Sequence, residues 1–255
     1  MPFEPIEPEK LSHVVERQIE LLILRGILHP GERLPAERDL AERLAVSRPS
    51  LRDAISSLQG KGHLVSKAGA GVFVAEVVGS AFSDGLVSLM GAHDAALFDY
   101  IAFRRDLEGL AAERAAQVGS DTDLALIKTV LDQMEEAHGR RASAAEAELD
   151  ARFHMAIIEA SHNIVMLHMM RAMFDLLKKG VFYNRQVMFR QRATRETLLD
   201  QHRAINAAIQ ARDPNAARYA VETHLSFVEE MLSAHLKSQE HEAFAQRRLT
   251  HAKKV

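Results

Sequence analysis

The chain has 255 residues, of which 47% are hydrophobic and 26% are charged. This composition is ordinary for a globular protein and excludes wholesale disorder. The absence of cysteine excludes disulfide scaffolds, thiolate metal ligands and cysteine nucleophiles. The 32 Lys and Arg residues are balanced by 35 Asp and Glu, which gives a net charge of -3. Any surface that binds nucleic acid therefore has to be local.

The sequence predicts neither a membrane span nor a secretory leader. No apolar run approaches the roughly 20 residues that span a bilayer, and residues 1–9 are acidic rather than basic and then apolar. We therefore expect a mature cytoplasmic protein. At roughly 100 to 200 residues per domain, the length suits one large or two modest domains.

Three short helices and a hairpin are predicted in the first part of the chain. Apolar residues recur at helical spacing over 11–28, 35–44 and 48–59. A tight turn separates the last two helices, an arrangement typical of a helix-turn-helix whose second helix enters the DNA major groove. Residues 64–74 contain two β-branched or aromatic stretches around glycines. They predict a β-hairpin in the position of a wing.

The positive charge of this region is concentrated around the third predicted helix. From 43 to 67 there are five cations and one acid, whereas residues 1–76 carry 10 cations and 11 acids. Ser47 is a suitable N-cap for the helix, and Arg48 and Arg52 share one of its faces. The arginine fork binds guanine or phosphate in a bidentate manner. The alternative is a small helical core with solvated arginines, which the order of the elements disfavours.

Three segments, 31–41, 46–54 and 69–74, resemble the DNA-binding domain of the GntR family of bacterial transcription regulators. The resemblance implies a winged helix-turn-helix that binds double-stranded operator DNA. It places six residues where members of the family contact the operator, namely Arg38, Ser47, Arg48, Ser50, Arg52 and Gly69.

The remainder of the chain predicts a second, all-helical domain. Residues 77–94 are rich in Gly and Ser and are typical of a linker, with room for one short helix over 82–90. An antiparallel bundle is expected over 95–240, followed by a polar tail at 241–255 that we expect to be a frayed helix end. The fold class is thus mainly α. The bundle helices are predicted at 95–118, 121–138, 142–161, 164–188, 191–211 and 214–240.

Four polar residues of the predicted bundle are spaced so that they can meet. Asp150 and His154 lie four apart, on one face of a helix. His202 and His224 lie at equal distances from the turn centred on Asp213, so in an antiparallel pair they have the same height. Three histidines and a carboxylate suit Zn²⁺, Ni²⁺ or Mn²⁺ with positions open for water or a ligand. The alternative is that each is an ordinary surface or capped residue.

Segments 103–108, 150–163, 202–205 and 224–225 resemble the FCD effector domain of the FadR-type GntR subfamily. By this resemblance the four polar residues hold a divalent cation. The resemblance also implies that Arg104 helps to bind a small carboxylate effector, such as a 2-hydroxy or 2-keto acid. Members of the subfamily are usually homodimers that read two half-sites of an inverted repeat.

The sequence therefore favours a ligand-responsive transcription regulator, most simply a repressor, over an enzyme. One alternative is a metal-dependent hydrolase or lyase at the same Asp/His site, with Glu159 or Glu222 as general base. That alternative leaves residues 31–74 unexplained. A further alternative keeps the DNA-binding function but makes the metal purely structural, with the effector bound elsewhere.

Overall fold

The computed structural model describes residues 9–76, 83–140, 142–178 and 192–252. Contacts between Cα atoms divide the chain into two compact units with their boundary between residues 81 and 82. We refer to them as the N-terminal unit and the helical unit. Parts of the expected acidic start, linker, fourth and fifth bundle helices and tail lie outside the described residues, at 1–8, 77–82, 179–188, 191 and 253–255.

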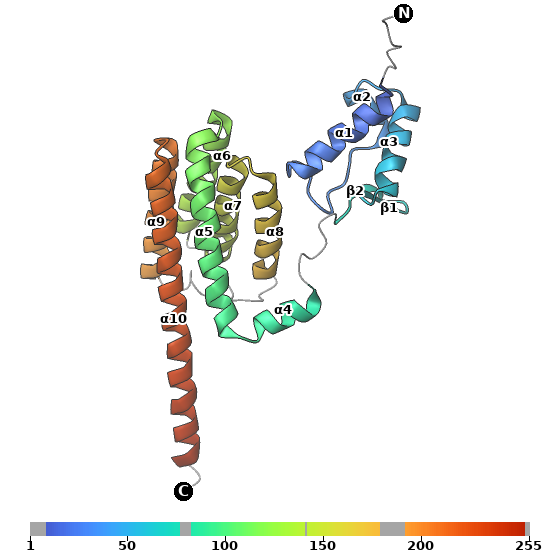
Figure 1. The fold of residues 1–255 in the computed structure, drawn as a ribbon. Coiled ribbons are helices and arrows are strands. Elements are labelled where there is room, and N and C mark those ends of the chain that lie inside the picture. The colour runs from blue at the N-terminus through green and yellow to red at the C-terminus, as the bar shows by residue number, and fades with distance from the viewer. Residues whose placement is uncertain (1–8, 77–82, 141, 179–191, 253–255) are drawn as a thin grey trace, which may run out of the picture. The chain divides into compact units, whose positions relative to one another are not determined.

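The N-terminal unit contains three helices followed by an antiparallel hairpin, as the sequence predicted (Figure 1). The hairpin pairs Leu64 with Val74 and Lys67 with Gly71. An isolated bridge between Arg33 and Phe73 joins the segment before the second helix to the hairpin. The elements are α1 (Leu11–Leu24), α2 (Glu37–Arg43), α3 (Arg48–Gly60), β1 (Leu64–Lys67) and β2 (Gly71–Val74).

The first helix is shorter than predicted. It ends at Leu24, because Gly26 takes a positive φ of 73° that glycine tolerates. The amides of Ile27 and Leu28 then donate back to the carbonyl of Leu22, at 2.9 and 3.1 Å. This left-handed turn closes the helix before residue 28.

The core of the N-terminal unit lies between α1 and α3. Leu51, Ala54 and Leu58 recur every three or four residues along α3 and are fully buried. They belong to one apolar cluster with Val15 and Ile19 of α1. The opposite face of α3 is thereby left in contact with solvent.

The turn between α2 and α3 uses two local devices. Ala45 has a φ of 52°, in the left-handed region, and its amide donates to the carbonyl of Glu42 at 3.1 Å. Ser47 Oγ accepts a hydrogen bond from the amide of Ser50 at 3.2 Å, which confirms the predicted N-cap of α3. The turn ends α2 and starts α3 within four residues.

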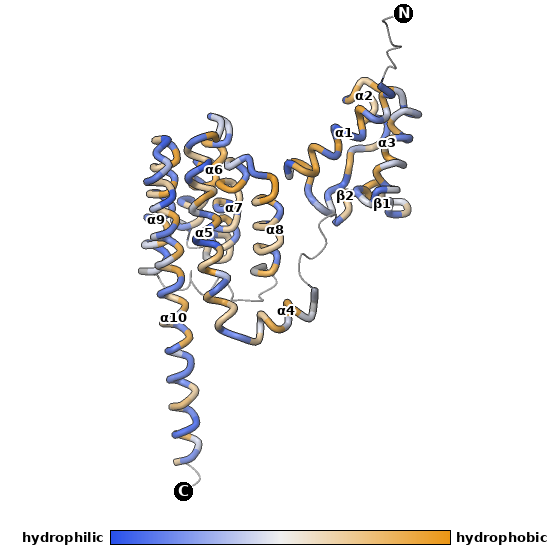
Figure 2. The backbone as a smooth tube through the Cα atoms, in the orientation of Figure 1, coloured by the Kyte–Doolittle hydropathy of each residue, from blue (hydrophilic) through white to orange (hydrophobic). Residues whose placement is uncertain are grey.

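The helical unit contains only α-helices within the described residues, so the mainly α fold class is confirmed. α4 lies in the expected linker, and its Val87 packs against the core of the bundle. Each bundle helix carries both hydrophobic and hydrophilic residues along its length (Figure 2). The helices are α4 (Asp84–Gly91), α5 (Asp94–Val118), α6 (Asp121–Gly139), α7 (Ser143–Ala160), α8 (Ile164–Lys178), α9 (Arg192–Gln210) and α10 (Pro214–Ala252).

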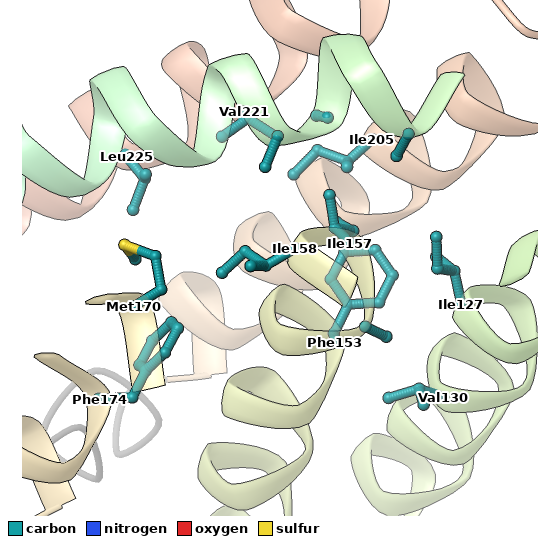
Figure 3. Packing of buried hydrophobic residues seen from close by; sticks show 14 of the residues in the cluster. Ile127, Val130, Phe153, Ile157, Ile158, Met170, Phe174, Ile205, Val221 and Leu225 are labelled. Atoms are coloured by element: carbon teal, nitrogen blue, oxygen red, sulfur yellow. The ribbon is translucent and has the colours of Figure 1, made fainter. Parts of the chain in front are cut away.

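One apolar core joins the helices of this unit. Helix α5 contacts α7, α9 and α10, while α6 packs against α7 and α9. Figure 3 shows buried side chains of this core pointing toward one another, among them Phe153 of α7, Ile205 of α9 and Val221 of α10. All three are fully buried. Helices distant in sequence are thus held side by side, and polar residues on their inner faces are brought together.

Helix α10 is longer than predicted. It continues to Ala252, whereas the sequence predicted a bundle helix to residue 240 and a frayed end at 241–255. Residues 237–252 are largely exposed, and in Figure 1 this half of α10 extends past the other helices of its unit. Side chains four residues apart bond along it, as between Gln246 and Glu242 at 2.9 Å. Such local pairs favour a helix without tertiary partners.

No single described helix is both long and apolar enough to cross a membrane. α4 and α5 reach that threshold only when they are taken together, and they are bent by 99° at their junction.

The left-handed turn generates a prediction about stability. Replacing Ala45 with Gly should raise the free energy of unfolding by about 0.5 to 1 kcal/mol, because glycine has no Cβ to oppose a positive φ. Chemical denaturation measures the change. The control is Ala125→Gly at an exposed position of α6, which should lower stability by a similar amount. If Ala45→Gly also lowers stability, the turn is not strained by its alanine.

Candidate functional site

The four polar residues singled out in the bundle meet in the structure. Asp150 and His154 come from successive turns of α7, His202 comes from α9 and His224 from α10. Each offers one ligand atom, and these atoms all lie within 4.8 Å of one another. Their exposed fractions are 7%, 1%, 0% and 1% respectively. The antiparallel α9–α10 pair therefore brings its two histidines to one height, as the spacing predicted.

Within the cluster, the nitrogen and oxygen atoms that could bind a metal face one another. His202 Nε2 lies 3.2 Å from Asp150 Oδ1 and 3.4 Å from His154 Nε2. The ring of His224 is centred 4.5 Å from that of His202 and 5.1 Å from that of His154. Phe153 packs edge-on against His202, with ring centroids 5.1 Å apart. The site is thus a polar cluster with an apolar side.

The chemistry of this donor set fits a divalent transition metal. Neutral imidazoles and a carboxylate are the ligands that Zn²⁺, Ni²⁺ and Mn²⁺ take from proteins. When two imidazole Nε2 atoms face each other at 3.4 Å, at most one of them can donate a hydrogen to the other. A cation shared by the ligand atoms satisfies all of them together. The residues present therefore fit a metal centre.

The outward-facing nitrogens of the histidines have different surroundings. His154 Nδ1 lies 2.6 Å from Glu108 Oε2, and His224 Nδ1 lies 3.0 Å from Gln201 Oε1. An oxygen this close to Nδ1 favours the tautomer with its proton there and leaves Nε2 with its lone pair for a metal. Within the described residues Glu108 Oε2 is in close contact with His154 Nδ1 but not in hydrogen-bond geometry. His202 Nδ1 is buried and has no hydrogen-bond partner among the described residues.

Burial keeps two of the imidazoles uncharged. It lowers the pKa of His154, and the opposing charge of Glu108 only partly offsets that effect. Burial also lowers the pKa of His224 well below its usual value, and the neighbouring His202 adds to the shift. Neutral histidines at these positions are in the form that coordinates a metal.

Arg104 lies in the core and is linked to the four-residue cluster through Glu108. Its Nε donates to Glu108 Oε1 at 2.6 Å, and both side chains are 2% exposed. The guanidinium also stands over the ring of Phe174, 5.0 Å from its centroid. Burial alone would raise the pKa of Glu108, but the interactions with Arg104 and His154 together outweigh it and lower that pKa to about 2. Glu108 is therefore an ionised carboxylate inside the bundle.

Sequence reasoning did not single out Glu108 or Gln201. Glu108 carried one signal, since it lies four residues after Arg104 on the same face of a helix. Gln201 precedes His202 in sequence yet contacts His224 of the next helix. Such a contact depends on how α9 and α10 are rotated about their axes, and helical spacing alone does not determine that rotation.

A small pocket lies next to the cluster, beside His202. On its wall Arg195 Nε donates to Glu146 Oε2 at 2.9 Å, and a second bond joins Arg195 Nη2 to the other carboxylate oxygen. Sequence reasoning missed this buried ion pair between α7 and α9 as well. The pocket is lined by Met134, His138, Glu146, Arg195, Leu199 and His202.

The structure places the six predicted DNA-contacting residues in the N-terminal unit. Ser47, Arg48, Ser50 and Arg52 occupy the start of α3 and its N-cap. Arg38 is on α2, with its side chain 83% exposed. Gly69 lies in the hairpin turn with a φ of 70°, and nothing lies within 4 Å of the place where a Cβ would be.

Both arginines of α3 bind one carboxylate of α2. Glu37 Oε1 lies 3.2 Å from Arg48 Nε and 2.8 Å from Arg52 Nε. Hydrogen bonding to Arg52 in particular lowers the pKa of Glu37. Glu37 was not predicted as a functional residue, because its place beside the two arginines depends on how α2 crosses α3.

A helix-turn-helix with a hairpin wing, followed by a separate helical unit with a buried polar centre, defines a DNA-binding transcription regulator. Two family models match the chain. Residues 11–74 match the one described as bacterial regulatory proteins, gntR family, and residues 99–227 match the FCD domain. The chain belongs to the GntR family and carries an FCD domain.

Curated relatives agree with this assignment. The chain is 37% identical over 225 residues to the "Putative L-lactate dehydrogenase operon regulatory protein" of Escherichia coli, covering 87% of this chain and 86% of the relative. It is 31% identical over 229 residues to the Glc operon transcriptional activator of the same species, covering 89% and 90%. Both names describe regulators, which confirms the prediction of a transcription regulator and does not support a hydrolase or lyase.

A solved structure supports the same fold. The Streptococcus agalactiae GntR structure aligns with a TM-score of 0.52 at 24% identity, covering 86% of this chain and all of that chain.

Proposed function

We propose that this regulator binds a divalent metal ion at Asp150, His154, His202 and His224, and that a small carboxylate bound beside the metal alters operator binding. The observation that carries the proposal is the convergence of four ligand atoms within 4.8 Å inside the helical unit. Clusters of this kind without a cation leave buried polar atoms poorly satisfied. Zn²⁺, Ni²⁺ and Mn²⁺ are the candidate ions.

The residues around the centre support binding of an acid. When bound, a divalent metal supplies a Lewis-acidic position that accepts carboxylate or hydroxyl oxygens. Glu108 and Gln201 hold the rings of His154 and His224 in place. The guanidinium of Arg104 provides the planar fork that suits a carboxylate. A relative named for an L-lactate dehydrogenase operon favours a 2-hydroxy or 2-keto acid.

For DNA binding, we propose that α3 enters the major groove of an operator and that the hairpin contacts the backbone nearby. Arg38, Ser47, Arg48, Ser50, Arg52 and Gly69 are the proposed contacts. A homodimer would present two copies of α3 to an inverted repeat. An acid that favours one arrangement of the bundle then changes the affinity of the dimer for the operator, most simply by releasing a repressor.

A second candidate role for the metal is purely structural. The observation in its favour is the burial of all four ligands, which is typical of closed sites. In that case the metal stabilises the fold and the acid binds elsewhere.

The direct test is elemental analysis of the purified protein followed by a thermal-shift screen. L-lactate, glycolate and pyruvate are the first acids to examine. We expect one divalent ion per chain and a melting temperature that rises with one of these acids. Protein that holds no metal after reloading would contradict the proposed centre.

Replacing His202 with Ala should bring metal content close to zero. The melting temperature of metal-loaded protein should fall by about 5 °C or more, because a ligand that binds only the folded state stabilises it. The matched control is His241→Ala at an exposed position of α10, which should leave both quantities unchanged. Full metal stoichiometry in the His202 variant would remove that residue from the ligand set.

Replacing Arg52 with Ala should weaken operator binding by about 10- to 100-fold while the protein stays folded. Arg52 is exposed on α3 and adds nothing to the core. Arg17 on α1 is the control, since it is also an exposed arginine paired with a carboxylate, Glu9 at 2.8 Å. Gel-shift titration of both variants checks the expectation. Equal loss in the two variants would indicate a general effect of charge.

Replacing Arg104 with Lys should lower affinity for the acid by about tenfold or more, because lysine keeps the charge but lacks the planar fork. Arg105→Lys is the control, since that neighbour pairs with Glu229 at 2.7 Å away from the cluster. Calorimetric titration of metal-loaded protein measures the difference. An acid affinity that is the same in both variants would favour a purely structural metal.

A further inference from the structure

One carboxylate in the core of the helical unit holds two cationic or proton-bearing partners. Glu108 Oε1 accepts from Arg104 Nε at 2.6 Å, and Glu108 Oε2 lies 2.6 Å from His154 Nδ1. The three side chains are 2% exposed or less. Arg104 and Glu108 belong to α5 and His154 to α7. The residue proposed to bind the acid is therefore joined to a proposed metal ligand through a single side chain.

Only a carboxylate suits this position. One of its oxygens accepts from the guanidinium, and the other, which makes no hydrogen bond within the described residues, lies close enough to His154 Nδ1 to be available to an Nδ1–H. The amide of glutamine offers one acceptor and one donor group, so it would fail either Arg104 or His154. A proton at Nδ1 is also what leaves Nε2 of His154 available to a metal.

Among the three histidines of the cluster, His154 alone has a carboxylate beside its Nδ1 in the described part of the chain. His224 Nδ1 faces the neutral amide of Gln201 at 3.0 Å, and His202 Nδ1 has no hydrogen-bond partner there. The structure therefore has one outer contact that reaches Arg104 and another, at Gln201, that serves as an internal comparison.

We infer that Glu108 is a positioning residue that couples binding of the acid to binding of the metal. The inference rests on the proposed function and adds the route by which its two ligands are linked. A cation bound at Nε2 would make the His154 ring a stronger hydrogen-bond donor at Nδ1. The ring would then balance more of the negative charge of Glu108. Arg104 is then less neutralised and attracts an anion more strongly. By linkage, the acid strengthens metal binding by the same factor.

The test compares Glu108→Gln with Gln201→Ala in the full-length protein. Co²⁺ is the metal probe, followed by its visible absorption and by competition with a chelator. L-lactate is the acid probe, and its affinity is measured calorimetrically with and without Co²⁺. The ratio of these two affinities is the coupling factor. Wild-type protein should give a ratio well above one.

Glu108→Gln should lower Co²⁺ affinity by about 10- to 100-fold and bring the coupling factor well below the wild-type value. Any coupling that remains is that of an acid coordinated directly to the metal. Gln201→Ala should also weaken Co²⁺ binding, because His224 loses its acceptor, yet it should keep the wild-type coupling factor. Loss of coupling in Glu108→Gln alone supports the inference. Unchanged coupling in Glu108→Gln, or equal loss of coupling in both variants, overturns it.

Co²⁺ affinity can be measured without the acid, and it distinguishes failure of the proposed metal site from failure of the role inferred for Glu108. Wild-type protein that takes up no Co²⁺ overturns the proposed function. Wild-type protein that takes up Co²⁺ while Glu108→Gln binds it equally well overturns the inference alone. If Glu108→Gln does not fold, Arg104→Met with Glu108→Met removes both charges together, and wild-type Co²⁺ affinity in that double variant overturns the inference as well.

Discussion

The arrangement of the helical unit depends on keeping polar side chains satisfied inside an apolar core. Buried imidazoles and carboxylates lower stability unless each polar atom has a partner. Here α5, α7, α9 and α10 each contribute polar side chains that lie close to one another. Phe153 closes one side of the cluster against the rings of His202 and His154. The apolar packing in Figure 3 sets the distances between the helices. The polar cluster then restricts how they can rotate.

Helical spacing carried much of the prediction. It placed the starts of the bundle helices close to those observed, and the symmetry of His202 and His224 about the α9–α10 turn brought both into the cluster. Glu108, Gln201 and Glu37 could not be found in the same way. Their roles depend on contacts between helices, which are fixed by crossing angles and rotations that a one-dimensional pattern does not contain. Helix α10 extends beyond its predicted end. Side-chain hydrogen bonds between residues four apart continue past the bundle, and a pattern of core-facing residues does not register them.

The N-terminal unit resolves a different electrostatic problem. Arg48 and Arg52 lie on one face of a short helix, so two like charges are brought close together. Glu37 binds both of them through one oxygen, so the free protein holds the two guanidiniums near a common point. Exposed ion pairs of this kind contribute little to stability. Their effect is to limit the rotamers of the two arginines.

Helix α10 joins two environments in one continuous element. His224 lies in its buried part, while residues 237–252 are exposed. The backbone hydrogen bonds are similar throughout, but their resistance to opening is not, since an isolated helix end frays without tertiary packing. Amide protons along α10 therefore form a graded series, from those that exchange only when the whole bundle opens to those that exchange freely with solvent.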